Sequence, residues 1–289
     1  MTRAIVVGTD GTDYSSIAVD WAAHEARRRR LPLRIVHAYD WDWQQARFSV
    51  GNAYVEMART FAEGVVAGAL DRARQIAPSI EITTDTMIGN AVPRLLEAAA
   101  GAELLVVGGR GRGGFTGLLL GSVSQQMATH APCPVVVVRG HASVTGRPIV
   151  AGVDDSPAAE HVLETAFTMA AEEDADLTVV RAYLPVIPLW IAGVAPATLD
   201  MPEQDADEQK ALDEQLAPWR AKFPEVRVRT TVTHESAAFT LVEASRKARL
   251  VIVGSRGHGV LAGSLIGSTG LQLLHHAIAP VYVVRPQPA

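Results

Sequence analysis

The feature that most constrains this chain is an internal repeat. Three short apolar segments of the first half recur in the second half: 5–10 as 149–154, 105–108 as 251–254, and 134–139 as 280–285. Asp10 recurs as Asp154 and Gly108 as Gly254, so the copies lie 144 to 146 residues apart. A unit of that length is far longer than a solenoid repeat, and we therefore expect each copy to be a whole domain.

Length and composition agree with two domains, which we expect at 1–140 and 147–289. The chain has 289 residues, and a domain usually takes roughly 100–200. The single cysteine, Cys133, excludes an internal disulfide and favours a reducing, cytoplasmic location. The first apolar run is too short for a signal peptide, and no stretch approaches the ~20 apolar residues of a membrane helix.

Short β-branched runs alternate with longer helical stretches in the first copy. The expected strands are 4–9, 33–39, 80–86, 103–108 and 134–139, and the expected helices are 14–30, 54–77, 91–101 and 121–130. In the second copy the expected strands are near 148–153, 176–182, 226–232, 249–254 and 280–285. Several strands are apolar throughout, which is typical of parallel strands covered on both faces. The order predicts an α/β fold of two tandem, doubly wound parallel sheets.

The charge pattern argues against a nucleic-acid partner. The formal net charge is −5 at pH 7, whereas nonspecific nucleic-acid binding depends on a basic face. The one basic cluster, Arg27–Arg30, stands at the end of a predicted helix, where the helix dipole stabilises cations. We therefore expect this cluster to be structural.

A glycine-rich loop follows the fourth predicted strand of each copy. Both loops fit the pattern G-x2-G-x9-G-S, from Gly108 to Ser122 and from Gly254 to Ser268. Glycine lets the backbone approach a ligand closely, and the closing Gly-Ser opens a predicted helix whose N–H groups favour an anion. The serine can cap that helix or bond a phosphate oxygen. The loops also carry Arg110, Arg112, Gly113, Arg256, His258 and Gly259.

These loops differ from the two best-known nucleotide loops. A Walker A loop needs G-x4-G-K-[ST], but neither loop contains lysine, and no G-x-G-x-x-G follows the first strand. Neither P-loop hydrolysis nor dinucleotide redox chemistry is therefore indicated. The alternative is a turn that only reverses the chain. The recurrence of the loop at the same place in both copies favours phosphate binding, because glycine is costly in ordered structure.

One aspartate ends the first predicted strand of each copy, Asp10 and Asp154. Its carboxylate can accept hydrogen bonds from an adenine amine or a ribose hydroxyl, or it can cap the following helix. Ligands of open parallel sheets bind where the strand order reverses, which favours the ligand role. We expect Asp10→Glu and Gly108→Ala each to weaken nucleotide binding without unfolding the domain.

With these motifs the chain resembles a tandem universal stress protein of the ATP-binding branch, of a kind common in actinobacteria. The resemblance covers nearly all of both halves except 40–55 and 184–210. It implies five parallel strands in the order 3-2-1-4-5, as in adenine nucleotide alpha hydrolase-like folds, and domains paired through their fifth strands. It also implies a regulatory protein of stress or growth control that binds ATP, whose phosphates Mg²⁺ would accompany.

The resemblance implies one adenine-nucleotide site per domain. The binding residues of the first domain would be Gly8, Asp10, Ala38, Gly108, Arg110, Gly111, Arg112, Gly113, Gly121, Ser122 and Val123. Those of the second domain would be Gly152, Asp154, Ala182, Gly254, Arg256, Gly257, Gly259, Gly267, Ser268 and Thr269. Glu235 stands where the first copy has Gly89, so we expect the second site to differ, by repelling phosphates or by helping to hold a metal ion.

No convincing catalytic set accompanies the loops. Ser122 and Ser268 would be nucleophiles only beside a base, and the histidines show no metal-binding spacing. We expect His37, at the end of the second strand, to be structural. A slow ATPase or another adenine-nucleotide-processing enzyme is the alternative function. A second alternative is a partner-binding scaffold, in which the loops are only structural and the apolar segment 183–191 is a lid or a partner surface. A homodimer is a further expectation, because the apolar fifth strands would otherwise be exposed edges.

Overall fold

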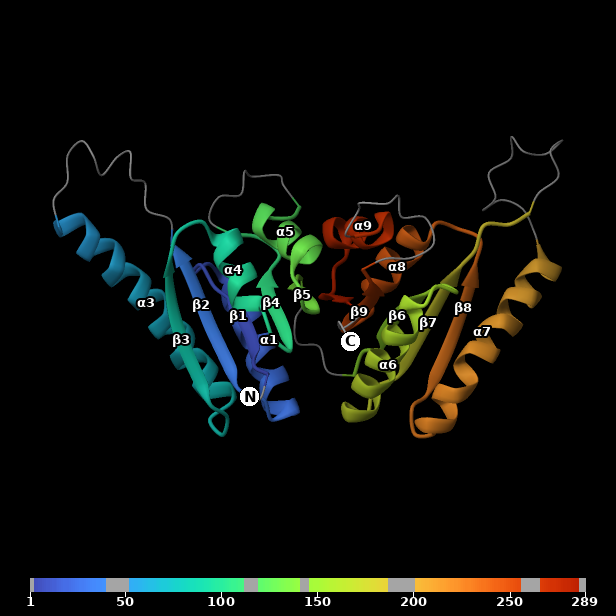
Figure 1. Ribbon diagram of the computed structural model, residues 1–289. Helices are drawn as coiled ribbons and strands as arrows, with labels where there is room; N and C mark the ends of the chain where they lie inside the picture. Colours follow the sequence, from blue (N-terminus) through green and yellow to red (C-terminus); the bar gives the residue numbers. More distant parts are fainter. Residues whose placement is uncertain are drawn as a thin grey trace. The chain divides into compact units, whose positions relative to one another are not determined.

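The computed structural model describes residues 3–39, 52–111, 119–140, 146–186, 201–255 and 266–285. Residue contacts divide the chain into two compact units, Met1–Ala142 and Ser143–Ala289. Each unit contains five parallel strands with helices on both faces (Figure 1). The predicted α/β fold with two tandem, doubly wound sheets is confirmed.

The first unit alternates strands with helices. Its elements are β1 (Ile5–Gly8), α1 (Asp13–Arg29), β2 (Leu33–Tyr39), α3 (Asn52–Ile76), β3 (Ile82–Ile88), α4 (Ala91–Ala99), β4 (Leu104–Gly108), α5 (Ser122–His130) and β5 (Val135–Val138). The strand order is β3-β2-β1-β4-β5 and all pairs are parallel, so the expected order 3-2-1-4-5 is confirmed. Helices α1 and α3 pack on one face of the sheet, and α4 and α5 on the other.

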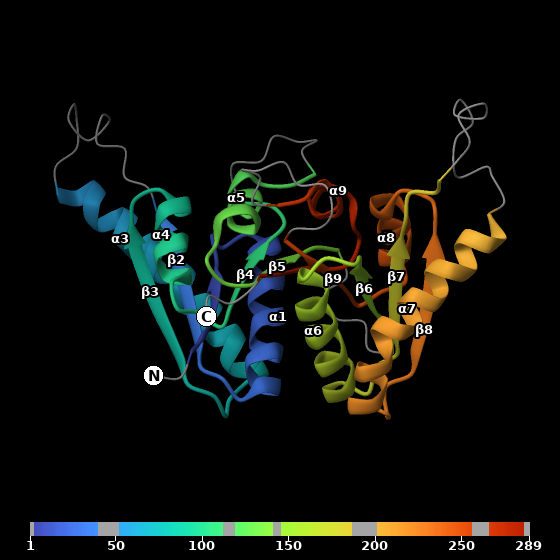
Figure 2. The same ribbon diagram turned by 45° about the vertical axis from the view of Figure 1, so that its right-hand side comes forward.

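The second unit repeats this arrangement. Its elements are β6 (Ile149–Val153), α6 (Ala158–Glu172), β7 (Leu177–Ala182), α7 (Pro202–Lys222), β8 (Val228–Thr233), α8 (Ala237–Ser245), β9 (Leu250–Gly254), α9 (Ser268–His276) and β10 (Val281–Val284). The order is β8-β7-β6-β9-β10, again with parallel pairs. Helices α6 and α7 cover one face, and α8 and α9 the other (Figure 2).

Burial explains which strands are apolar throughout. Strands β1, β4 and β5 are buried at every position, as expected for parallel strands beneath helices on both faces. Strand β3 pairs only with β2 among the described strands and has exposed positions. It begins at Ile82, because a turn in which Ile80 N–H donates to the carbonyl of Ala77 follows α3. The expected range 80–86 is therefore wrong by two residues.

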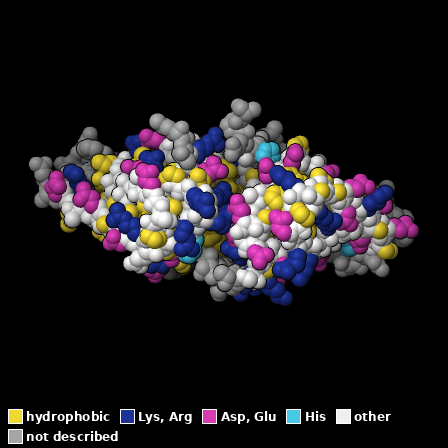
Figure 3. Space-filling view, turned by 90° about the horizontal axis from the view of Figure 1, so that it is seen from below, with side chains coloured by type: hydrophobic (Ala, Val, Ile, Leu, Met, Phe, Trp, Pro, Cys, Tyr) yellow, Lys and Arg dark blue, Asp and Glu magenta, His cyan; other side chains and the backbone are white. Residues whose placement is uncertain are grey.

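The basic cluster at the end of α1 is held in contacts within its own unit. Arg28 and Arg29 both donate to Glu25, whose side chain is only 5% exposed. Arg27 donates to the carbonyl of Ile76 at 2.7 Å, which joins the ends of α1 and α3. On the face in Figure 3, basic and acidic side chains are both spread over the described surface. None of the helices that the structure describes has the length and hydropathy needed to span a membrane.

Candidate functional site

In each unit the carboxyl ends of three neighbouring strands border one cavity. The ends of β1, β2 and β4 border a cavity of about 1000 Å³ in the first unit. The ends of β6, β7 and β9 border one of about 460 Å³ in the second. Strands β1 and β6 are the points at which the strand order reverses, which is where open parallel sheets bind ligands.

Most of the predicted site residues line these two cavities. In the first unit they are Gly8, Asp10, Ala38, Gly108, Arg110, Gly111, Gly121, Ser122 and Val123. In the second unit they are Gly152, Asp154, Ala182, Gly254, Gly267, Ser268 and Thr269. The remaining five lie outside the described residues: Arg112, Gly113, Arg256, Gly257 and Gly259. That these residues bind a nucleotide stays a prediction.

The two ends of each glycine-rich loop are joined by a backbone hydrogen bond. The N–H of Gly121 donates to the carbonyl of Gly109 at 2.8 Å, and that of Gly267 donates to Ser255 at 3.0 Å. In the first unit Ser124, in the first turn of α5, also donates its hydroxyl to the carbonyl of Gly108 at 2.5 Å. Because of these bonds, each loop begins and ends beside the same strand end, and helices α5 and α9 start at the cavities.

Helices α5 and α9 present N-termini without a side-chain cap. Their N-cap residues are Gly121 and Gly267, and neither helix has a side-chain cap hydrogen bond. The expectation that Ser122 or Ser268 could cap the helix is therefore wrong, since each is the first helical residue and lies past the cap. The first N–H groups of a helix have no intrahelical partner, and together with the helix dipole they favour an anion.

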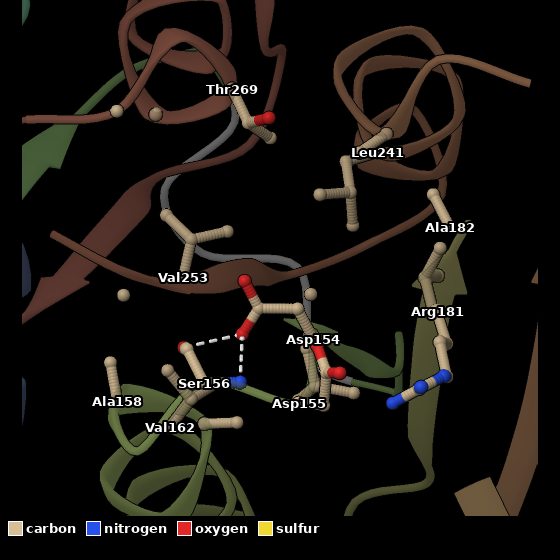
Figure 4. A pocket seen from close by; sticks show the side chains of 18 of the residues that line it. Asp154, Asp155, Ser156, Ala158, Val162, Arg181, Ala182, Leu241, Val253 and Thr269 are labelled. Carbon is tan, nitrogen blue, oxygen red and sulfur yellow. Dashed lines mark hydrogen bonds between the residues drawn. The ribbon is translucent and has the colours of Figure 1, made fainter. Parts of the chain in front are cut away.

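The aspartates after β1 and β6 orient the turn into the next helix. Asp10 Oδ1 accepts hydrogen bonds from the N–H of Thr12 at 3.1 Å and from its hydroxyl at 2.6 Å. Asp154 Oδ1 accepts the same pair from Ser156, at 3.0 and 2.5 Å (Figure 4). The N-cap of α1 is Thr12 and that of α6 is Pro157. The N-cap interpretation is therefore wrong for both aspartates.

Close packing requires one of the predicted binding glycines. A Cβ atom on Gly108 would lie 2.7 Å from the carbonyl oxygen of Tyr14, at the start of α1. A Cβ on Gly152 would lie 2.7 Å from Cδ1 of Leu241 of α8, the end of a side chain that can move and that points into the second cavity in Figure 4. Gly108 therefore fixes how closely α1 approaches the end of β4, whatever else it contacts.

Helix α3 supplies an apolar wall that the sequence did not predict. Met57 and Phe61 line the first cavity, although their side chains are 62% and 52% exposed. Residues four apart lie on one helix face, so the spacing predicts that Met57 and Phe61 share a face of α3. Nothing in the sequence predicts that this face lies at the strand ends. The wall gives an apolar side to the first cavity, which Ala38 also lines.

The second cavity carries an ion pair where the first has a histidine. Arg181 of β7 and Glu208 of α7 both line it, with Arg181 Nε 2.6 Å from Glu208 Oε2. The corresponding residue of β2, His37, is 3% exposed, and its Nδ1 lies 2.7 Å from the carbonyl oxygen of Thr9. Since a carbonyl can only accept, Nδ1 carries the proton. His37 thus joins β2 to the turn after β1, which is a structural role.

That Glu235 makes the second site differ from the first stays a prediction. It is exposed and is not among the described residues that line the second cavity. Within the described part of the chain, no three His, Cys, Asp or Glu side chains are grouped so that they could hold a metal ion. Of the apolar segment 183–191, residues 187–191 lie outside the described residues.

Comparisons with known proteins give the family. The universal stress protein family profile matches residues 1–139 and 146–285. A universal stress protein of Mycobacterium tuberculosis is 35% identical over 292 residues, which cover 97% of this chain and 96% of that protein. One of Mycolicibacterium smegmatis is 32% identical over 294 residues, with coverages of 98% and 97%. The crystal structure of a universal stress protein from Archaeoglobus fulgidus covers 100% of both chains, with a TM-score of 0.74 and 16% identity. The chain therefore belongs to the universal stress protein family.

Proposed function

We propose that each domain binds one adenine nucleotide, ATP, and that the protein acts as a regulator of stress or growth rather than as an enzyme. The observation that carries the proposal is the helix N-terminus without a side-chain cap at each cavity, α5 in one domain and α9 in the other. Backbone N–H groups there would bind phosphate oxygens.

The residues around the first cavity fit the parts of such a nucleotide. The apolar wall of Met57 and Phe61 suits the face of a base, next to the backbone of Ala38. Arg110, whose guanidinium carbon lies 5.6 Å from the ring centroid of Tyr14, supplies positive charge at the loop. We propose that Mg²⁺ accompanies the phosphates and is held mainly by them, because the described carboxylates form no metal cluster.

A regulatory role agrees with the chemistry of the described residues. Phosphoryl transfer needs metal ligands and a positioned nucleophile in addition to phosphate binding. A bound nucleotide changes a protein's state only through different affinities for two states.

We propose that the domains pair through β5 and β10, which are apolar along their whole length, and that a homodimer uses such edges too. We propose a cytoplasmic location, in keeping with the single cysteine of the chain, Cys133, which is buried.

The nucleotide content of the purified protein tests this function. We expect denatured protein to release ATP or a related adenine nucleotide, at up to one per domain, and nucleotide-free protein to bind ATP with Mg²⁺ in calorimetry. A folded, nucleotide-free protein that gives no heat with ATP would overturn the proposal. Multiple-turnover phosphate release that Gly121→Ala abolishes would instead establish the alternative, a slow ATPase.

A further inference from the structure

Arg139 directly follows β5 and lies against both ends of the first glycine-rich loop. Its Nη2 donates to the carbonyl of Leu119 at 2.9 Å, two residues before the N-cap of α5. At the other end of the loop, a Cβ on Gly109 would lie 3.0 Å from Arg139 Cγ. Because Gly109 has no side chain, the Arg139 side chain has room to pass beside it.

The described residues compensate the positive charge and the N–H groups of the Arg139 guanidinium only in part. Its Nη1 is buried and has no hydrogen-bond partner among the described residues. Burial, and in second place the positive charge of Arg110, lower the pKa of Arg139 to about 10. A buried donor without a partner is costly, and two like charges repel. The repulsion between the two charges falls when an anion enters, because Arg110 lines the cavity in which the anion would lie.

We propose that Arg139 is a positioning residue of the first site that makes affinity depend on the number of phosphates on the nucleotide. It acts through the carbonyl of Leu119, which sets the end of the loop, and through its charge next to Arg110. Each added phosphate compensates more of the positive charge that these two residues bring together. The inference rests on the proposed nucleotide binding and deepens it. In the repeat, Arg285 holds the corresponding place after β10.

Calorimetric titration with adenosine, AMP, ADP and ATP, with Mg²⁺ present for ADP and ATP, tests this inference. The full chain carries Asp154→Ala in every sample, which we expect to weaken binding at the second domain throughout. Arg139→Gln removes the charge and leaves a shorter, neutral side chain, and Arg139→Lys keeps the charge. Arg74→Gln is the matched control, because it removes the same charge from an exposed residue in the last turn of α3.

In Arg139→Gln we expect ATP affinity to fall about tenfold, the size of one charge-assisted contact, and adenosine affinity to change less than twofold. Arg139→Lys should restore most of the preference for ATP over AMP, and Arg74→Gln should leave it unchanged. Equal weakening of all four ligands by Arg139→Gln, or an unchanged ratio of ATP to AMP affinity, would overturn the inference. If the parent chain binds none of the ligands, the proposed function fails together with the inference, and that result is seen before any Arg139 variant is compared.

Discussion

The carboxylate of Asp10 lies where a side chain on Gly111 would begin: a Cβ atom on Gly111 would stand 2.7 Å from Asp10 Oδ2. The other oxygen of that carboxylate holds Thr12. The carboxylate of one aspartate therefore holds the turn after β1 and lies beside the glycine-rich loop after β4. Gly111 is needed here for room, since no positive φ is recorded for it.

Gly111→Ala should weaken nucleotide binding at the first domain with little loss of stability. The new methyl group would displace the carboxylate of Asp10, which is the mobile end of a side chain, so the backbone can stay in place. We expect ATP affinity to fall about tenfold, as for one hydrogen-bonded contact, and the free energy of unfolding to stay within about 0.5 kcal/mol. Calorimetry and urea denaturation measure the two effects. Unchanged affinity would mean that Asp10 does not contact the ligand.

Gly108→Ala should destabilise the first domain without unfolding it, a cost that the sequence did not predict. Its Cβ would lie 2.7 Å from the carbonyl oxygen of Tyr14 and 3.2 Å from the N of Ser15, which are backbone atoms that cannot rotate away. Overpacking of this kind costs about 1–3 kcal/mol. Urea denaturation with tryptophan fluorescence and circular dichroism measures the loss.

Gly121→Ala is the control for that variant. Its Cβ would meet nothing nearer than 3.5 Å, so the free energy of unfolding should fall only by the difference between glycine and alanine as N-cap residues, about 0.5–1 kcal/mol. Loss of ATP binding in Gly121→Ala would then report on the ligand alone. Equal stability of the Gly108 and Gly121 variants would contradict the packing argument.

The fold and the edge of the sheet that carries the cavity were predictable because repeated motifs mark them. Asp10 follows β1 and Gly108 ends β4, and the carboxyl ends of parallel strands meet at one edge, so their convergence follows from topology. The capping role was not predictable, because Asp10 and Thr12 are both good N-cap residues. Only the backbone turn between them decides that Thr12 is the cap.

Tertiary packing decides what the sequence left open. Glu235 directly precedes the N-cap of α8 and is exposed, and it is not among the described residues that line the second cavity. Met57 and Phe61 enter the cavity because of how α3 packs on the sheet, which a helical pattern alone does not fix. In the sequence, Arg139 is marked only as the last residue of a repeated strand motif. Its contact with Leu119 depends on the course of the loop, which the motif does not give.

Glu208→Gln should destabilise the second domain through its partner Arg181. The side chains are 28% and 11% exposed and lie 2.6 Å apart, so the change leaves a mostly buried guanidinium without its counter-charge. We expect a loss of about 2 kcal/mol, less than for a fully buried pair. Glu63→Gln is the control, because the pair Arg59–Glu63 is exposed on both sides and such pairs contribute about 0–1 kcal/mol. Urea denaturation compares them, and similar losses in both variants would contradict this account.

Tyr183→Phe should lower stability by an amount that depends on pH. The Tyr183 hydroxyl donates to Asp205 Oδ1 at 2.7 Å, and burial, followed by this hydrogen bond, raises the pKa of Tyr183 to about 12. Folding thus favours the neutral phenol, whose contribution is complete below the ordinary tyrosine pKa of about 10 and is lost as the pH rises to about 12.

At pH 7 to 9 we expect Tyr183→Phe to lose about 1 kcal/mol, the usual net value of one hydrogen bond. The difference from the wild type should shrink between pH 10 and 12, because only the wild type has a phenol to ionise at this position. Urea denaturation of both proteins at each pH measures it, and all other titrating groups cancel in the difference. A deficit that stays constant or grows across this range would show that folding does not favour the neutral form of Tyr183.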